Sequence, residues 1–323
     1  MVLHENEIEI NLPLVRALVD QALPEFAGRR LRPMAATGSS NALFRLGDDL
    51  IVRMPRQPGG SATITKEARW LPYVAPALPI AVPEIVAVGG PDLGYPERWS
   101  IVRWIDGHSP DVSIPLEAPD PGLARDLAEV VAALRAVHIP TEAQEDPALR
   151  SYRGGSLASV DTYTRDNIAS CRRLAGLGID LEACLRIWSD AQALCGTEAV
   201  EPRWLHGDLL AENLLLRDGH LAAVLDFGAL SVGDPTVDLI VAWALLDPPG
   251  RALFRSVLGV DEVTWRRGRA WALAIAMMTF PYYWATMPQR CAAAMVMAHA
   301  VLADATPEPA GAGKALPRKR ITR

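Results

Sequence analysis

The residues best suited to chemistry lie in His206-Gly207-Asp208-Leu209-Leu210-Ala211-Glu212-Asn213 and in the later Leu225-Asp226-Phe227-Gly228. Transfer of a phosphoryl group needs a carboxylate that orients the attacking hydroxyl and takes its proton. It also needs hard oxygen ligands for the metal ions that neutralise the phosphates. Asp208 and Asn213 place a base and a metal ligand on one loop, and Asp226 supplies a second metal ligand. This spacing matches the catalytic loop and the metal-binding triplet of kinases.

Either motif alone is weak evidence, because an Asp that follows Gly is ordinary turn chemistry. Their occurrence in this order, with the apolar run Leu221 to Leu225 leading into Asp226, is what favours a kinase site. His206 has no neighbour that marks it as a nucleophile or a base. We therefore expect His206 and Gly228 to support the loop rather than to react.

The composition narrows the class of partner. The 32 Lys and Arg residues against 38 Asp and Glu give a formal net charge of −6, which argues against nucleic acid as the main partner. A cationic acceptor would suit this charge, although mild acidity is also ordinary for enzymes.

The sequence also predicts a cytoplasmic protein. No C-x-x-C pair or metal-type spacing joins the four Cys residues, so we expect reduced thiols. We see no signal peptide at the N-terminus. The most apolar stretch, Ala270 to Thr279, is too short to span a membrane and is expected to be a buried helix.

The order of expected elements indicates a bilobal α+β fold. Residues 1–105 read as strands with one or two helices, and residues 106–305 as mostly helical around a segment that carries both motifs. The composition of residues 306–323 predicts a disordered tail. A ligand site usually lies in the cleft between two lobes. We expect strands at 41–46, 50–54, 84–89 and 100–104, and helices at 14–23, 61–74, 122–137, 160–174, 181–194 and from about 235 onward.

Both motifs, with Gly233-Asp234-Pro235-Thr236-Val237-Asp238-Leu239 after them, resemble those of the antibiotic phosphotransferases, the aminoglycoside and macrolide kinases. Asn41 to Arg53 and Ser100 to Trp104 are similar to the small lobe and hinge of that family. The resemblance covers about residues 30–303. It implies a protein-kinase-like fold with a small antiparallel-sheet lobe, a larger helical lobe, and a nucleoside triphosphate, ATP or GTP, as donor.

By this resemblance, Asp208 is the catalytic base or hydroxyl-orienting group, Asn213 and Asp226 bind magnesium, and His206 is structural. Kinases of this type also place a strand lysine, paired with a helix glutamate, on the triphosphate. The corresponding strand here carries Arg53, and Glu67 on the next expected helix is its natural partner.

This arginine is a departure from the family pattern, because a guanidinium grips phosphate oxygens with a geometry different from that of an ammonium. A surface strand arginine is the alternative interpretation of Arg53. Lys66 is a rival cation, but we expect it on a different side of the helix from Glu67.

A further nucleotide contact is expected from Thr37-Gly38-Ser39-Ser40-Asn41, where Ser39 and Ser40 could cover the phosphates with backbone N–H groups and hydroxyls. The segment carries neither a Rossmann nor a Walker pattern, so a plain turn before a strand is an equal alternative.

Asp234 and Asp238 are expected to have structural roles. Asp234 before Pro235 is a good helix N-cap followed by a favoured first helical residue. The run from Thr236 to Leu246 is apolar and helical in pattern, and Asp238 in its first turn is placed to brace the catalytic loop.

The sequence leaves the acceptor open. Acidic candidates in the larger lobe are Asp161, Asp166, Glu212 and Asp247, and Tyr282 to Trp284 form an aromatic candidate face. Three hypotheses stand: a kinase for an aminoglycoside, macrolide or similar metabolite, a choline-, homoserine- or sugar-kinase-like enzyme, and a nucleotide-binding module without catalysis. The choice of ATP or GTP and the oligomeric state are not determined.

Overall fold

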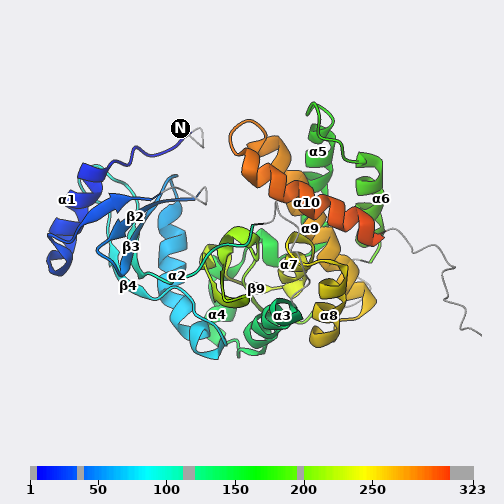
Figure 1. The fold of residues 1–323 in the computed structure, drawn as a ribbon, viewed down its shortest axis with the longest axis horizontal. Coiled ribbons are helices and arrows are strands. Elements are labelled where there is room, and N and C mark those ends of the chain that lie inside the picture. Colours follow the sequence, from blue (N-terminus) through cyan, green and yellow to red (C-terminus); the bar gives the residue numbers. More distant parts are fainter. Residues whose placement is uncertain (1–5, 35–39, 112–120, 195–199, 306–323) are drawn as a thin grey trace, which may run out of the picture.

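The computed structural model describes residues 6–34, 40–111, 121–194 and 200–305. Within these ranges the chain begins with an antiparallel sheet flanked by helices and continues as a larger, mostly helical part (Figure 1). The expected tail, 306–323, lies outside the described residues. The mixed α+β class and the small antiparallel sheet confirm the predicted fold class.

The sheet has five strands in the order β1-β2-β3-β5-β4, and every neighbouring pair is antiparallel. In β2 the side chains alternate strictly between inward and outward, so that Ala42, Phe44 and Leu46 are buried. Helix α1 (Leu12–Ala22), capped by Asn11, packs its buried face into the same cluster. The strands are β1 (Leu31–Pro33), β2 (Asn41–Leu46), β3 (Leu50–Pro55), β4 (Ile85–Gly89) and β5 (Trp99–Arg103).

Helix α2 (Gly60–Val74) stands between the sheet and the helical part (Figure 1). Its C-terminal half places Trp70, Leu71 and Val74 in the hydrophobic cluster of the large part. A helix from the first segment therefore belongs to the core of the second. The division of the chain at residue 105 stays a prediction.

The helical part is built around α9 (Glu262–Tyr283). Its Ala270 to Thr279 segment is buried except for the half-buried Met278, as expected of a core helix. Two small two-stranded sheets, β6 with β9 and β7 with β8, form the segment that holds the motifs. The other α-helices and strands of the described residues are α3 (Pro121–Ala136), α4 (Thr141–Glu145), α5 (Asp161–Cys171), α6 (Leu181–Gln192), β6 (Arg203–Leu205), β7 (Leu214–Arg217), β8 (His220–Val224), β9 (Ser231–Gly233), α7 (Val241–Ala244), α8 (Pro248–Leu258) and α10 (Pro288–Ala305).

The sequence predicted a single helix over 236–246, but the structure divides this segment between two shorter helices. A 3-10 helix, Pro235–Ile240, leads into the short α7, which ends before the Asp247-Pro248 step. Proline disfavours the α conformation in the residue before it, so α8 must begin afresh with Asp247 as its cap. The break does not expose the segment, because its apolar side chains are buried around α9.

None of the described helices is long and apolar enough to cross a membrane. The described cysteines, Cys171, Cys184 and Cys291, are buried free thiols, and Cys195 lies outside the described residues. Burial raises the pKa of the Cys171 thiol to about 11 and that of Cys184 to about 12, so both stay protonated and unreactive near neutral pH.

Candidate active site

The loop after β6 carries Asp208, and its backbone is hydrogen-bonded to the side chain of Asp238. The Asp238 carboxylate is fully buried and accepts the backbone N–H groups of His206 at 2.8 Å and of Gly207 at 2.7 Å. Gly207 has φ +82°, and a Cβ there would lie 2.9 Å from the Ala229 carbonyl oxygen, so only glycine fits this turn. Asp238 thus fixes the backbone immediately before Asp208.

His206 ties the same loop to the strand that leads into Asp226. Its Nδ1 accepts the N–H of Asp208 at 3.2 Å, and its Nε2 lies 3.0 Å from the carbonyl oxygen of Leu225. Because Nδ1 accepts, Nε2 must carry the proton and donate to that carbonyl. The ring also meets Phe227 edge to face at 4.7 Å. The structure therefore places His206 as a link between the two motifs, with both ring nitrogens occupied.

Both carboxylate oxygens of Asp208 accept hydrogen bonds from side chains. Oδ1 accepts from Nη1 of Arg153, which also donates to the Gly207 carbonyl at 2.8 Å, and Oδ2 accepts from Nδ2 of Asn213 at 3.0 Å. Burial alone opposes ionisation of this carboxyl, but the charge and hydrogen bond of Arg153, with smaller help from Arg290, outweigh it. The pKa of Asp208 is held below its ordinary value. The carboxylate is ionised and fixed in orientation.

Asp226 adopts a left-handed backbone conformation, with φ 55° and ψ 70°. This is an uncommon and strained conformation for a residue other than glycine, and such strain concentrates at functional sites. The side chain accepts the N–H of Gly228 at 3.2 Å and lies 3.6 Å from Nη2 of Arg53. A Cβ at Gly228 would lie 2.9 Å from Cγ2 of Thr63 on α2, so this glycine allows the helix to approach the motif.

Arg53 and Glu67 form a buried bidentate ion pair, with Nη1 to Oε2 at 2.9 Å and Nη2 to Oε1 at 3.3 Å. Burial opposes the charge of Arg53, but the carboxylates of Glu67 and Asp226 outweigh it and raise its pKa. Burial also raises the pKa of Glu67, an effect that Arg53 only partly offsets. Arg53 therefore joins the sheet, α2 and Asp226, and it is not the surface arginine of the alternative interpretation.

Lys66 is also buried, at 9% exposure, and burial lowers its pKa. Sequence spacing placed it on another side of the helix from Glu67, which is fully buried. Because α2 is covered on two sides, by the sheet and by the helical part, both positions lie inside.

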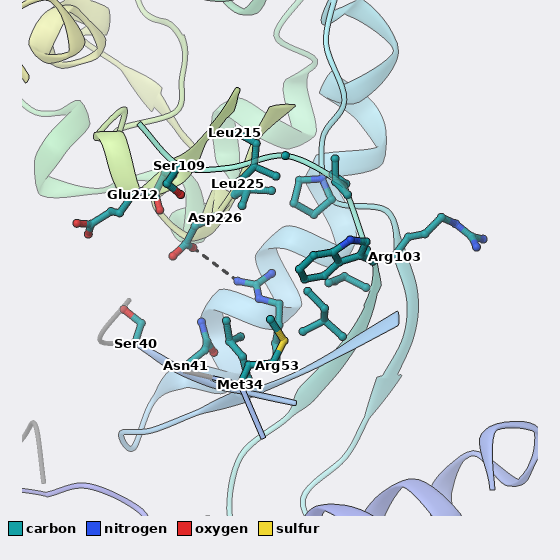
Figure 2. A pocket seen from close by; sticks show the side chains of 18 residues that line it. Met34, Ser40, Asn41, Arg53, Arg103, Ser109, Glu212, Leu215, Leu225 and Asp226 are labelled. Atoms are coloured by element: carbon teal, nitrogen blue, oxygen red, sulfur yellow. Dashed lines mark ion pairs between the residues drawn. The ribbon is translucent and has the colours of Figure 1, made fainter. Parts of the chain in front are cut away.

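A cavity of about 260 Å³ opens between the sheet and the motif segment (Figure 2). The dashed line in the figure marks the Arg53–Asp226 pair at its polar end. Asn213 and Asp226 line this cavity, and so do Ser40 and Asn41 from the start of β2. Ser39 lies outside the described residues. Apolar side chains form much of the remaining wall, chiefly Met34, Leu43, Ile51, Val102, Leu215 and Leu225, and Arg103, Ser109 and Glu212 also line it.

Asn213 and Asp226 offer a donor set suited to magnesium. Nδ2 of Asn213 donates to Asp208, so Oδ1 is the side-chain atom of Asn213 that could bind a metal ion. The Asp226 side chain lines the same cavity and is 38% exposed. No group of three or more His, Cys, Asp or Glu side chains that could hold a metal occurs in the described ranges. Magnesium usually takes one or two protein ligands and completes its shell with phosphates and water, so the residues present fit that mode.

Asp234 lies behind this site rather than in it. Its Oδ1 accepts the N–H of Thr236 at 3.0 Å, which caps the 3-10 helix, and its Oδ2 pairs with Nη2 of Arg267 at 3.1 Å. Its own N–H donates to the Gly154 carbonyl. Asp234 thereby fixes the segment next to Arg153.

Two arginines near the catalytic loop were not found by sequence reasoning. Arg153 lies in the 3-10 helix Tyr152–Gly154 and reaches Asp208 over a separation of 55 residues. Arg290, in the first turn of α10, pairs with Glu212 at 2.7 Å. Neither has a local spacing that marks it, and only the three-dimensional fold brings each arginine to the loop.

Comparison with known proteins agrees with this geometry. A family model described as "Phosphotransferase enzyme family" matches residues 33–271. Comparison with the curated proteins gives no match.

Several solved structures share the fold. The GDP and kanamycin complex of APH(2″)-IIIa is 16% identical with a TM-score of 0.68, covering 92% of this chain and 100% of that one. The streptomycin–ATP–APH(2″)-IIa ternary complex is 15% identical with a TM-score of 0.60, covering 92% and 97%. The macrolide 2′-phosphotransferase MphH from Brachybacterium faecium is 23% identical with a TM-score of 0.58, covering 88% and 97%. At these identities the likeness establishes the kinase-like fold.

Proposed function

We propose that this chain, which belongs to the phosphotransferase enzyme family, transfers the γ-phosphoryl group of ATP or GTP to a hydroxyl of a small molecule. An aminoglycoside, a macrolide or a similar metabolite is the acceptor that the resemblance suggests. The observation that carries the proposal is one hydrogen bond. Nδ2 of Asn213 donates to Oδ2 of Asp208, so the proposed base and a proposed metal ligand are joined beside the cavity that Asp226 also lines.

Asp208 would orient the acceptor hydroxyl and take its proton as the phosphoryl group transfers in line. The ion pair with Arg153 keeps the carboxylate ionised near neutral pH, and Asn213 fixes its plane. His206 and Asp238 hold the loop, so that positioning and electrostatics supply most of the rate.

Asn213 and Asp226 are the residues that would hold magnesium, which bridges phosphate oxygens and neutralises their developing charge. The apolar walls of the cavity suit a flat base, and Arg53 at its polar end suits the phosphates. Solved relatives bind GDP or ATP, which supports a nucleoside triphosphate donor. A triphosphate donor and buried reduced thiols both fit the cytoplasm, the compartment that we propose.

The test is release of nucleoside diphosphate from ATP and from GTP, with and without magnesium, in the presence of a mixed acceptor panel. The panel combines aminoglycosides, macrolides, choline, homoserine and simple sugars, and Asp208→Asn serves as the matched inactive control. We expect magnesium-dependent release that an acceptor stimulates and that Asp208→Asn abolishes. Tight nucleotide binding without any release, even to water, would instead support a nucleotide-binding module without catalysis.

A further inference from the structure

We infer that the acceptor of this enzyme is an alcohol with an apolar face and is not a polycation. This inference rests on the proposed function and narrows its substrate class. The evidence lies in the catalytic loop, where the carboxylates of Asp208 and Glu212 are already paired with arginines. A polycation would need such carboxylates as partners for its ammonium groups.

The paired carboxylates are Asp208, held by Arg153, and Glu212, held by Arg290 at 2.7 Å. These four side chains form one group at the catalytic loop, because Asp208 and Glu212 are only four residues apart in the chain. We call this group the acceptor charge cluster. Its formal charges are two negative and two positive, and each carboxylate already has an arginine as its partner.

Other carboxylates that could bind an ammonium group have structural partners instead. Asp161 accepts from Nε of Arg165 at 2.9 Å and from the indole of Trp188 at 2.6 Å. Asp247 caps α8 through the N–H of Gly250 at 2.9 Å. Four acidic residues in the large part were candidates for binding the acceptor. Within the described ranges, only Asp166, which is exposed on α5, has neither an arginine partner nor a helix-capping hydrogen bond.

The side chains that pack next to the cluster are mostly apolar and buried. A narrow cavity between the catalytic loop, α9 and α10 has Glu212, Thr279 and Arg290 as its polar members, and the rest of its lining is Leu210, Ala211, Ala244, Ile275, Ala293, Ala294 and Met297. Glu212 lines this cavity and also the larger cavity of about 260 Å³ that Asn213 and Asp226 line. In the larger cavity Glu212 lies on the side of Asp226 away from Arg103 (Figure 2).

Both arginines of the cluster contact a tyrosine. The guanidinium of Arg290 lies 4.9 Å from the ring centre of Tyr283, and Nε of Arg153 donates to the half-exposed Tyr152 hydroxyl. An apolar face of an acceptor can pack on such rings without breaking an ion pair. A polycation must instead displace an arginine from its carboxylate and then lie beside the released positive charge.

The experiment compares kanamycin, a polycation, with n-octyl β-D-glucoside, an uncharged alcohol with an apolar chain. Kanamycin binding is measured by calorimetry on the full chain with a non-hydrolysable ATP analogue, for the parent protein and for Arg290→Gln. The matched control is Arg255→Gln, because Arg255 also pairs with a glutamate, Glu262 at 2.8 Å, and lies over an aromatic ring, away from the catalytic loop.

We expect Arg290→Gln to tighten kanamycin binding about tenfold, since it frees Glu212 for an ammonium group. Arg255→Gln should leave the affinity unchanged. In the transfer assay the parent protein should phosphorylate the glucoside with at least about tenfold higher kcat/KM than kanamycin.

Faster transfer to kanamycin than to the glucoside would overturn the inference, and so would an Arg290→Gln affinity for kanamycin equal to that of the parent. If no triphosphate turns over in any mixture, the proposed function fails, and the kanamycin affinities of the two variants still decide the charge argument.

Discussion

The buried Arg53–Glu67 pair allows a prediction with a sign and a magnitude. Glu67 is fully buried and Arg53 is 8% exposed, so Arg53→Met would leave a carboxylate without its bonded cation inside the protein. Breaking a buried pair by removing one partner costs about 3–5 kcal/mol of unfolding free energy. Glu67→Gln should cost less, because Arg53 would keep Asp226 at 3.6 Å as a partner.

The pH dependence of the Arg53→Met variant follows from the same pair. Burial already raises the pKa of Glu67, and loss of Arg53 raises it further. The folded state then binds a proton that the unfolded state has released. The contribution of Glu67 to the stability of this variant should therefore be largest below the unfolded pKa of about 4.3 and fall as pH rises, by about 1.4 kcal/mol per pH unit, until the raised folded pKa is passed.

The assay is urea denaturation at several pH values for the parent, both single variants and the double variant Arg53→Met with Glu67→Leu. An apolar pair of similar volume should recover most of the stability, because no buried charge remains. Phosphoryl transfer should not recover, because the cation at the polar end of the cavity is gone. An Arg53→Met variant that loses less than about 1 kcal/mol, or a double variant as unstable as Arg53→Met, would refute the reasoning.

Three further predictions concern the catalytic loop. Asp208→Asn should lower kcat by about 10²- to 10⁴-fold while nucleotide affinity by calorimetry stays near that of the parent, and an unchanged kcat would exclude Asp208 as the base. Arg153→Gln should let burial dominate and raise the pKa of Asp208, so the acidic limb of the kcat/KM profile should move to higher pH; a limb that stays in place would contradict this. Asp238→Ala should cost about 2–6 kcal/mol of stability, since the buried N–H groups of His206 and Gly207 each lose a partner worth about 1–3 kcal/mol. Urea midpoints measure this loss, and a cost below about 1 kcal/mol would show that water replaces the carboxylate.

The local features of the fold were predictable because short-range rules set them. The alternation of apolar and polar residues predicted β2, and its burial alternates in the structure. Asn11, which caps α1, predicted the start of that helix to within two residues. Asp208, Asn213 and Asp226 were found because their chemistry depends on a fixed spacing along the chain. Their geometry agrees with that expectation, while their roles stay proposals that the variants above test.

Features set by contact between distant segments were not predictable in the same way. Arg153 reaches Asp208 from a segment whose Gly154 carbonyl accepts the backbone N–H of Asp234, a contact without any sequence pattern. Lys66 was expected to face another side of the helix from Glu67, and its burial depends on the packing of α2 against both the sheet and the helical part. The engagement of Glu212 by Arg290 likewise depends on how α10 packs over the loop.

The central claim is that Asp208 directs a γ-phosphoryl group onto an acceptor hydroxyl. The most direct test is mass spectrometry of acceptors incubated with magnesium and γ-labelled ATP or GTP, for the parent protein and for Asp208→Asn. We predict that the label appears as a phosphate ester on an acceptor with the parent protein and is absent with Asp208→Asn. Equal ester formation by both proteins would contradict the assignment of Asp208, and label found in no acceptor and not released to water would contradict the proposed activity itself.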